Sequence, residues 1–284
     1  MGRIVYVNGD YLAEELAKIS VFDRGFLMAD AVYEVTSVLD GKICDFPAHI
    51  ARLHRSLGEL DMPAPVDDDA LLEIHRELVR RNELAEGVIY LQVTRGTADR
   101  DFAWGEDMAP GLVLFTQDRP LVATKQAETG IRVISIDDLR WGRRDIKTVQ
   151  LLYPSMAKMA AKKAGKDDAW MVQEGFVTEG TSNNAYIVTG DGTIVTRHLG
   201  TEILHGITRA SVLKLASEAQ MKIEERPFTV AEAQRAQEAF MTAASAFVCP
   251  VVEIDGVTVG EGVPGAVTKR LRDIYIENAR AASL

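Results

Sequence analysis

Four separated stretches of the sequence carry residue types that could do chemistry together. The first is Lys147, which lies where the arginine-rich segment 140–144 gives way to the apolar residues 149–152. A lysine held at such a junction and partly desolvated has a lowered pKa and can form an imine with a carbonyl compound. For this residue taken alone, a solvated surface lysine is the alternative interpretation, and its companions along the chain favour the reactive amine.

The other three stretches supply a carboxylate and two phosphate-binding features. Glu179 stands at the end of a predicted strand, before the polar turn 180–183, and Gly206-Ile207-Thr208 opens a predicted helix whose free N–H groups could bind a phosphate. Arg52 is a forked donor that could hold the same phosphate through two hydrogen bonds, although a solvated helix arginine also explains it. A cofactor with an aldehyde, a ring nitrogen and a phosphate would use all four features, with the carboxylate keeping the pyridine nitrogen protonated.

Composition limits the class of protein. The chain has 284 residues, 47% of them hydrophobic and 26% charged, which is typical of a globular protein that stays in water. A net charge of -10 argues against a nucleic-acid-binding surface, and no window approaches the length and hydropathy of a membrane span. The two cysteines, Cys44 and Cys249, suit a reducing compartment and lack the spacing of a zinc site, so no metal is expected. Because the start also lacks the apolar run of a signal peptide, a cytoplasmic location is expected.

Strand-like and helix-like segments alternate along the chain, and several strands come in pairs joined by tight turns. Strands are expected at 4–7, 32–39, 42–46, 88–94, 112–116, 131–136, 169–172, 176–179, 185–188, 193–196 and 239–241, and helices at 47–57, 67–81, 154–164, after Thr208, after Thr229 and at 267–279. Paired strands favour a mixed α/β fold, with a mixed sheet or barrel and helices packed outside, over a doubly wound parallel sheet. The segment from Asp118 to Glu128 is the best candidate for a linker, which predicts domains at 1–119 and 131–284 joined by 120–130.

These motifs resemble those of a known family. Phe46-Pro47-Ala48-His49-Ile50-Ala51-Arg52-Leu53, Asp145-Ile146-Lys147, Thr178-Glu179-Gly180-Thr181-Ser182-Asn183 and Leu204-His205-Gly206-Ile207-Thr208-Arg209 look like the motifs of the fold-type IV enzymes that depend on pyridoxal 5'-phosphate. That family includes D-amino acid, branched-chain and R-selective amine aminotransferases and aminodeoxychorismate lyase. The resemblance spans nearly the whole chain and implies a small N-terminal α/β domain, a larger C-terminal barrel-like domain, and a homodimer with active sites at the domain and subunit interfaces.

The resemblance also implies roles for individual residues. Lys147 would be the Schiff-base lysine and Glu179 the partner of the pyridine nitrogen. The phosphate would be held by Arg52, Ile207 and Thr208. Leu204 would pack on the ring and Ser182 would lie close to the cofactor, although a core leucine and a polar turn explain these two residues equally well.

Within the family, the D-amino acid aminotransferases are the most similar subgroup. In those enzymes the loop after the Val-Thr-Arg-Gly strand supplies an arginine that binds the substrate carboxylate across the dimer, and Arg100 falls at that place. Tyr33 matches a second carboxylate contact. Two residues after Arg100, the chain has Phe102 where better-known members have a histidine.

Other departures concern the phosphate and the substrate pocket. A threonine that contacts the phosphate commonly falls near Ala244, and Ser245 could substitute for it. Ala31 stands where a glycine is usual, and Met28 where an aromatic residue is frequent. Since Ala31 shares a strand face with Tyr33, its methyl group would narrow the substrate pocket.

The expected function is transamination from D-amino acids such as D-alanine to 2-oxoglutarate or pyruvate. The alternatives are an R-selective amine or branched-chain amino acid transaminase, a lyase on the same scaffold, and a protein that binds the cofactor without turnover. The sequence leaves the preferred amino donor and the best 2-oxo acid acceptor open. It predicts small-molecule partners, with neither nucleic acid nor membrane.

Overall fold

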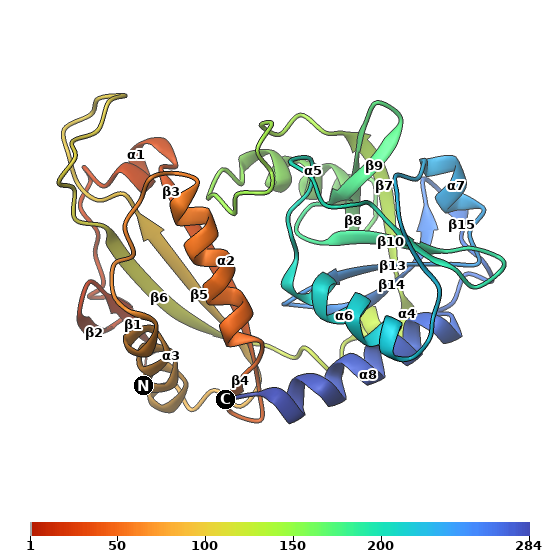
Figure 1. Ribbon diagram of the computed structural model, residues 1–284, viewed down its shortest axis with the longest axis horizontal. Helices are drawn as coiled ribbons and strands as arrows, with labels where there is room; N and C mark the ends of the chain where they lie inside the picture. Colours follow the sequence, from red (N-terminus) through yellow and green to blue (C-terminus); the bar gives the residue numbers. More distant parts are fainter. Residues whose placement is uncertain (1) are drawn as a thin grey trace. The chain divides into compact units, whose positions relative to one another are not determined.

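The computed structural model describes residues 2–284, which form two compact units (Figure 1). Unit 1 contains the chain up to Pro120 together with two later segments, Ile146–Gln150 and Ala279–Leu284. Unit 2 contains Leu121–Asp145 and Leu151–Asn278. Neither unit is therefore one continuous stretch of sequence. The expected linker, 120–130, includes a short helix, α4 (Lys125–Thr129), whose N-cap Thr124 accepts a hydrogen bond from the N–H of Ala127.

Unit 1 is an antiparallel sheet with two helices on one face (Figure 1). In the described part of the chain this sheet has six strands in the order β2-β1-β6-β5-β3-β4. Its elements are β1 (Ile4–Val7), β2 (Asp10–Ala13), α1 (Arg24–Met28), β3 (Ala31–Leu39), β4 (Lys42–Ile43), α2 (Phe46–Gly58), α3 (Asp68–Arg81), β5 (Gly87–Thr94) and β6 (Gly111–Asp118). Pro47 in the first turn of α2 and the N-cap Asp67 of α3 explain why these helices begin where they do.

The face of this sheet opposite α2 and α3 carries a row of aromatic rings. Strand alternation leaves Tyr33, Tyr90 and Phe115 only partly buried, whereas their strand neighbours are buried. The ring centroids of Tyr33 and Tyr90 lie 5.5 Å apart, and those of Tyr90 and Phe115 lie 4.8 Å apart, both in stacked geometry. The row therefore runs across three neighbouring strands, β3, β5 and β6.

The segment Ile146–Gln150 joins unit 1 at the edge of β3. Because β4 pairs only with the last two residues of β3, the first residues of β3 are open on that side. The N–H of Tyr33 donates to the carbonyl of Lys147 at 3.0 Å, and the N–H of Val149 donates to the carbonyl of Ala31 at 3.1 Å. Thr148 forms an antiparallel bridge with Val32. These two backbone hydrogen bonds, which form the bridge, thus fix the position of Lys147.

Unit 2 is a mixed sheet that curls into a partial barrel with helices outside it (Figure 1). Within residues 2–284 it has nine strands, eight of them in the order β12-β11-β10-β13-β14-β7-β8-β9, with β15 paired to β14. Its elements are β7 (Ile131–Asp137), α5 (Leu152–Lys163), β8 (Asp168–Gln173), β9 (Phe176–Gly180), β10 (Asn184–Val188), β11 (Ile194–Thr196), α6 (Ile207–Glu218), β12 (Ile223–Glu225), α7 (Val230–Gln234), β13 (Glu238–Ala243), β14 (Phe247–Ile254), β15 (Val257–Thr258) and most of α8 (Ala266–Ala282). A turn joins β9, at one end of the strand order, to β10, which lies inside it. In this turn the N–H of Gly180 donates to the carbonyl of Asn183 at 2.8 Å.

The mixed α/β fold expected from the sequence is confirmed. A core cluster that includes the buried rings of Trp170 and Phe228 fills the interior of unit 2. None of the helices formed by residues 2–284 is long and apolar enough to cross a bilayer. Over the same residues, no group of three or more His, Cys, Asp or Glu side chains could hold a metal ion.

Candidate active site

Lys147 lies at the edge of β3 with its amine over an aromatic ring. Its Nζ is 4.1 Å from the centroid of the Tyr33 ring, and its backbone N–H donates to Ser56 Oγ at 3.3 Å. Its neighbours Ile146 and Thr148 are buried. The ring replaces part of the water around the ammonium group, while the backbone contacts hold the residue in place. The predicted reactive amine and the predicted substrate contact Tyr33 are therefore adjacent in unit 1.

Arg52 is held by a buried carboxylate that the sequence did not single out. Arg52 Nε donates to Glu34 Oε1 at 2.8 Å and Arg52 Nη2 to Glu34 Oε2 at 2.7 Å, while His49 Nδ1 lies 2.7 Å from Glu34 Oε2. Burial acts to raise the pKa of Glu34, but the charge and hydrogen bonds of Arg52, helped by His49, outweigh it and hold that pKa well below its usual range. The bidentate pair fixes the orientation of the guanidinium that the phosphate role requires. One signal could have revealed it: Glu34 is a charged residue at a core-facing position of a strand.

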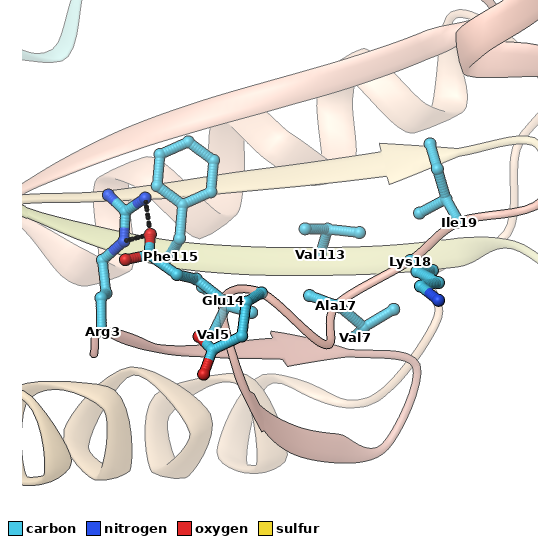
Figure 2. Close-up of a pocket in the computed structure, with 10 residues that line it drawn as sticks. Arg3, Val5, Val7, Glu14, Ala17, Lys18, Ile19, Val113 and Phe115 are labelled. Atoms are coloured by element: carbon cyan, nitrogen blue, oxygen red, sulfur yellow. Dashed lines mark hydrogen bonds and ion pairs between the residues drawn. The ribbon is translucent and has the colours of Figure 1, made fainter. Parts of the chain in front are cut away.

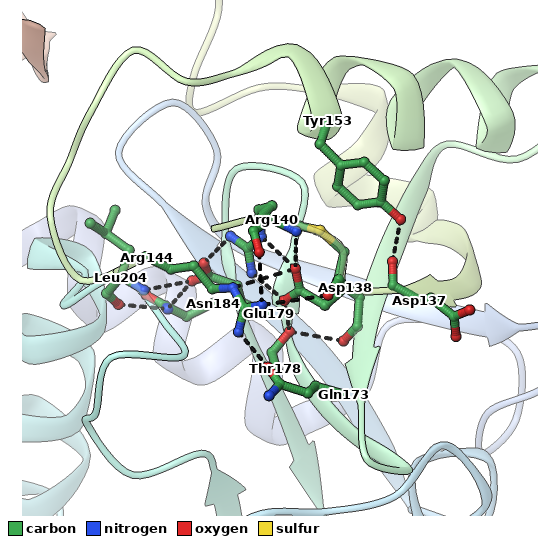
Figure 3. Close-up of polar contacts among 11 residues, drawn as sticks. Asp137, Asp138, Arg140, Arg144, Tyr153, Gln173, Thr178, Glu179, Asn184 and Leu204 are labelled. Carbon is green, nitrogen blue, oxygen red and sulfur yellow. Dashed lines mark hydrogen bonds and ion pairs between the residues drawn. The ribbon is translucent and has the colours of Figure 1, made fainter. Parts of the chain in front are cut away.

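Glu179 lies in a network of hydrogen-bond donors in unit 2 (Figure 3). One carboxylate oxygen accepts from Arg140 Nη1, and the other accepts from the N–H of Leu204 at 3.0 Å and from Asn184 Nδ2 at 3.1 Å. Asn184 Nδ2 also donates to the carbonyl of Leu204 at 3.0 Å. These partners are all donors, which suits an ionised carboxylate. The structure thereby brings together two predicted residues, Glu179 and Leu204.

A second carboxylate orients Arg140 toward Glu179 (Figure 3). Asp138 accepts from Arg140 Nε at 2.9 Å and from Arg140 Nη2 at 2.7 Å, and it also accepts from Thr178 Oγ1 at 2.7 Å. Burial raises the pKa of Glu179, and the charge and hydrogen bond of Arg140 and the N–H of Leu204 oppose that rise. Burial also acts to raise the pKa of Asp138, but Arg140 and Thr178 outweigh it and lower that pKa. The sequence predicted no role for Asp138, Arg140 or Asn184. Arg140 is 39 residues from its partner Glu179, and Asp138 is 40 residues from its partner Thr178.

The start of α6 has the features of a phosphate site. The first N–H groups of a helix have no partner inside the helix, and no side chain caps this end of α6. A Cβ atom at the N-cap Gly206 would meet Asn184 Oδ1 at 2.1 Å, so any other residue there would displace the Asn184 side chain. The uncapped N–H groups at Ile207 and Thr208 can therefore receive an anion. Asn184 links this helix start to Glu179, since its amide contacts both.

Other predicted residues lie outside these clusters. Ser182 is exposed in the turn before β10, and Ser245 is partly buried in the turn between β13 and β14. Arg100 and Phe102 are exposed on the loop between β5 and β6, where the Arg100 guanidinium carbon lies 5.5 Å from the centroid of the Phe102 ring. Ala31 is fully buried at the start of β3. The roles of these residues stay predictions.

Unit 1 also has a hollow of about 340 Å³ that is lined by none of the predicted site residues (Figure 2). Its floor is apolar and comes from β1, β6 and the segment 14–19, and an ion pair between Arg3 and Glu14 at 2.6 Å lies at its side. Phe115 belongs both to this hollow and to the aromatic row, so the hollow opens on the sheet face that carries Tyr33. No chemistry is assigned to it.

With this geometry described, the chain can be compared with known proteins. Residues 31–254 match the model of the amino-transferase class IV family. The chain therefore belongs to that family, whose members use pyridoxal 5'-phosphate.

Individual relatives narrow the comparison. The chain is 37% identical over 270 residues to a D-alanine aminotransferase of Bacillus licheniformis, covering 94% of each chain. It is 35% identical over 280 residues to a D-alanine aminotransferase of Staphylococcus aureus (strain MSSA476), covering 96% of this chain and 98% of the relative. Among solved structures it shares the fold of the Escherichia coli branched-chain amino acid aminotransferase, with a TM-score of 0.91, 23% identity and coverage of 98% and 95%. A second branched-chain amino acid aminotransferase, from T.th., is complexed with N-(5'-phosphopyridoxyl)-L-glutamate, and the chain matches it with a TM-score of 0.87, 27% identity and coverage of 99% and 95%.

The groups on this chain fit the family's cofactor. Lys147 offers an amine for an aldehyde, Glu179 a carboxylate for a ring nitrogen, and the uncapped start of α6 a set of N–H groups for a phosphate. The glycine at position 206 leaves room for the Asn184 side chain, which packs against this helix start and donates to Glu179.

Proposed function

We propose that this enzyme is a pyridoxal 5'-phosphate-dependent D-amino acid transaminase, which moves the amino group of a donor such as D-alanine to 2-oxoglutarate or pyruvate. Its similarity to the D-alanine aminotransferases over nearly the whole chain supports the substrate class. The structural observation that carries the proposal is the Lys147 amine, held over the Tyr33 ring at the edge of β3.

The bound cofactor supplies an electron-withdrawing ring that stabilises negative charge at the substrate Cα. Lys147 would hold the cofactor through its Nζ, and its free amine would be the base that moves the proton of the substrate Cα. Because two backbone hydrogen bonds hold this segment at the edge of β3, the Lys147 Nζ would return to the same place in each turnover.

The remaining residues orient the cofactor. Glu179 keeps the ring nitrogen protonated, and Arg140 keeps Glu179 ionised despite its burial. The N–H groups at Ile207 and Thr208 bind the phosphate, together with Arg52. We assign Leu204 to one face of the ring, and Ser182 and Ser245 to supporting contacts.

The substrate carboxylate is bound by Arg100 and Tyr33, with Ala31 limiting the space beside them. We propose that Arg100 acts in the site of a second copy of the chain, which makes the enzyme a homodimer. Exposed apolar side chains on two adjoining segments support this assembly: Phe22 is 50% exposed, Phe26 66%, Phe102 79% and Trp104 51%, and the segments are joined by the hydrogen bond from Ala98 N–H to the Phe22 carbonyl at 3.2 Å. The two free, buried cysteines fit a cytoplasmic location.

A donor panel tests the function. Purified enzyme with pyridoxal 5'-phosphate and 2-oxoglutarate is given D-alanine, L-alanine, L-leucine, D-glutamate and the R and S forms of 1-phenylethylamine, and formation of L- or D-glutamate is followed. For D-glutamate as the donor, pyruvate replaces 2-oxoglutarate as the acceptor, and alanine is the product that is followed. D-alanine is expected to give the highest kcat/KM of the panel. A preference for the R-amine or for L-leucine would favour the alternative functions of the family. An absorbance of the bound cofactor that does not change when D-alanine is added would reduce the protein to a cofactor binder.

The second candidate function is R-selective amine transamination, and one observation favours it. Phe102 presents an exposed apolar ring beside Arg100, at the place where relatives carry a histidine. An apolar group there suits a donor without a carboxylate. D-alanine and R-1-phenylethylamine have matching configuration, so their ratio compares a carboxylate with a phenyl group at the same position of the donor.

A further inference from the structure

A buried arginine, Arg24, donates hydrogen bonds to the backbone of the loop that carries Arg100. Arg24 is the first residue of α1, and its guanidinium is 4% exposed. Its Nη1 donates to the carbonyl of Asp101 at 2.7 Å and to that of Ala103 at 3.4 Å, and its Nη2 donates to the carbonyl of Phe102 at 3.4 Å. One side chain thus contacts three consecutive carbonyls, which follow Arg100 directly.

The charges around Arg24 explain why it binds these carbonyls. Arg24 Nε and Arg95 Nε both donate to the same oxygen of Asp30, each at 2.8 Å. Two buried guanidinium groups therefore share the single negative charge of Asp30. The remaining positive charge is stabilised by hydrogen bonds to backbone carbonyls. Arg95 uses the carbonyls of Leu60 at 2.8 Å and Asp61 at 3.3 Å, and Arg24 uses those of the loop.

Trp104 provides a second attachment for the same loop. The guanidinium carbon of Arg95 lies 3.9 Å from the centroid of the Trp104 ring, and that of Arg24 lies 5.8 Å from it. The first contact is at stacking distance, where the attraction between a guanidinium and an indole face is strongest. The loop backbone from Asp101 to Trp104 is consequently fixed on its inner side, whereas the side chains of Arg100 and Phe102 are exposed on its outer side.

We propose that Arg24 is a positioning residue for substrate specificity: with Arg95 and Trp104, it holds the 101–104 backbone so that Arg100 and Phe102 meet the donor's carboxylate in a fixed geometry. This inference rests on the proposed function, because the role of Arg100 is part of it. A preorganised backbone lowers the entropy cost of forming a bidentate contact with a carboxylate. Loss of Arg24 therefore weakens binding of donors that carry a carboxylate and leaves the chemistry at Lys147 intact.

Two variants remove the two attachments separately. In Arg24→Gln, Asp30 keeps its ion pair with Arg95, so no buried charge is stranded, and the shorter amide cannot reach the three carbonyls. Trp104→Leu changes a half-exposed side chain and leaves Arg24 in place. Arg76→Gln is the matched control, because Arg76 is an exposed arginine whose ion pair with Glu73 lies on α3.

The holoenzyme is used for two measurements. Hydrogen exchange, read by mass spectrometry on the peptide that spans 99–107, is expected to speed up about tenfold at the 101–104 amides in Arg24→Gln and less in Trp104→Leu. The KM for D-alanine is expected to rise about tenfold in Arg24→Gln with kcat nearly unchanged, since one charge-assisted contact is weakened. Arg76→Gln is expected to match the wild type in both measurements.

Unchanged exchange in both variants would overturn the proposal. So would faster exchange with an unchanged KM for D-alanine, provided that Arg100→Ala raises that KM. If Arg100→Ala also leaves KM unchanged, the carboxylate role of Arg100 fails, and the exchange data still report independently whether Arg24 holds the loop.

Discussion

Lys147 and Tyr33 contact each other twice, once through the backbone and once through their side chains. The N–H of Tyr33 donates to the Lys147 carbonyl at 3.0 Å, and Lys147 Nζ lies 4.1 Å from the centroid of the Tyr33 ring. The candidate nucleophile and a candidate substrate contact are therefore one rigid pair. A displacement of the start of β3 would move both groups together.

Replacing Lys147 by alanine should abolish transamination while the protein stays folded. The side chain contributes little more than its contact with the Tyr33 ring, so the free energy of unfolding should fall by about 1 kcal/mol or less. Borohydride reduction of the wild-type holoenzyme, followed by peptide mass spectrometry, should place the cofactor on Lys147. Lys158→Ala is the control, since Lys158 is half exposed and pairs with Asp168 at 3.1 Å. Labelling of a different lysine in the wild type would refute the assignment.

Replacing Arg140 by glutamine should weaken catalysis and move its pH profile. Without the charged donor, burial raises the pKa of Glu179 further, and the ionised carboxylate that the ring nitrogen needs is present only at higher pH. The kcat/KM at neutral pH should fall by roughly ten- to a hundredfold, and the acid limb of its pH profile should move upward. Arg235→Gln, at an exposed position outside the site, is the control. A lower rate with an unmoved acid limb would show that Arg140 only supports the fold.

Arg100 separates donors with a carboxylate from donors without one. Arg100→Ala should lower kcat/KM for D-alanine by about ten- to a hundredfold, because a hydrogen bond to a charged group is lost, and should leave R-1-phenylethylamine nearly unchanged. Phe102→His should shift the same ratio in the opposite direction, since it adds a polar group beside Arg100. Equal losses for acid and amine donors would contradict the carboxylate role and favour an amine transaminase.

The sequence predicted those strands and helices whose apolar residues recur with a regular spacing. Alternating or periodic apolar residues indicated β3, β5 and the helix α3, and these elements are present. No strand was expected at β14, Phe247–Ile254, whose apolar run contains Pro250, a residue that removes a ladder donor. The structure accommodates Pro250 because pairing of β14 with β7 begins only at Val251, so the proline has β13 as its neighbouring strand.

The candidate site was predictable only where a motif is contiguous. Lys147, Glu179 and Gly206 each lie in a short run of distinctive residues. Arg140 and Glu179 are 39 residues apart, and Arg52 and Glu34 are 18 apart. Such ion pairs depend on how strands are ordered, which the spacing of residues does not reveal. The same holds for the placement of Lys147 in unit 1, because only the open edge of β3 explains it.

A buried histidine should make stability depend on pH. Burial lowers the pKa of His75 from 6.5 to about 4, partly offset by the Leu71 carbonyl at 2.7 Å from Nδ1. The unfolded chain binds a proton below pH 6.5 and the folded chain does not, so this contribution to stability is present above pH 6.5 and is lost as the pH falls toward 4. The difference amounts to about 3 kcal/mol.

His75→Gln should therefore flatten the fall of the thermal midpoint between pH 6.5 and 4. The control is His54→Gln, because His54 is exposed and pairs with Asp68 at 2.6 Å. An equally steep fall in both variants would mean that other groups, carboxylates among them, set the acid sensitivity.

Unit 1 cannot be completed until late in translation, because two of its segments are made after residue 120. Ile43 exchanges two backbone hydrogen bonds with Leu284, each of 3.0 Å, and the edge of β3 pairs with the segment Ile146–Gln150. Domains usually fold as they emerge, the N-terminal one first. Here the first 120 residues emerge without their last partners, and they must stay unassociated with other chains while the rest is made. A tag fused directly after Leu284 would lie beside the contact between Leu284 and Ile43. The yield of folded protein and the amount bound to chaperones should therefore change more with a tag after Leu284 than with a tag before residue 2.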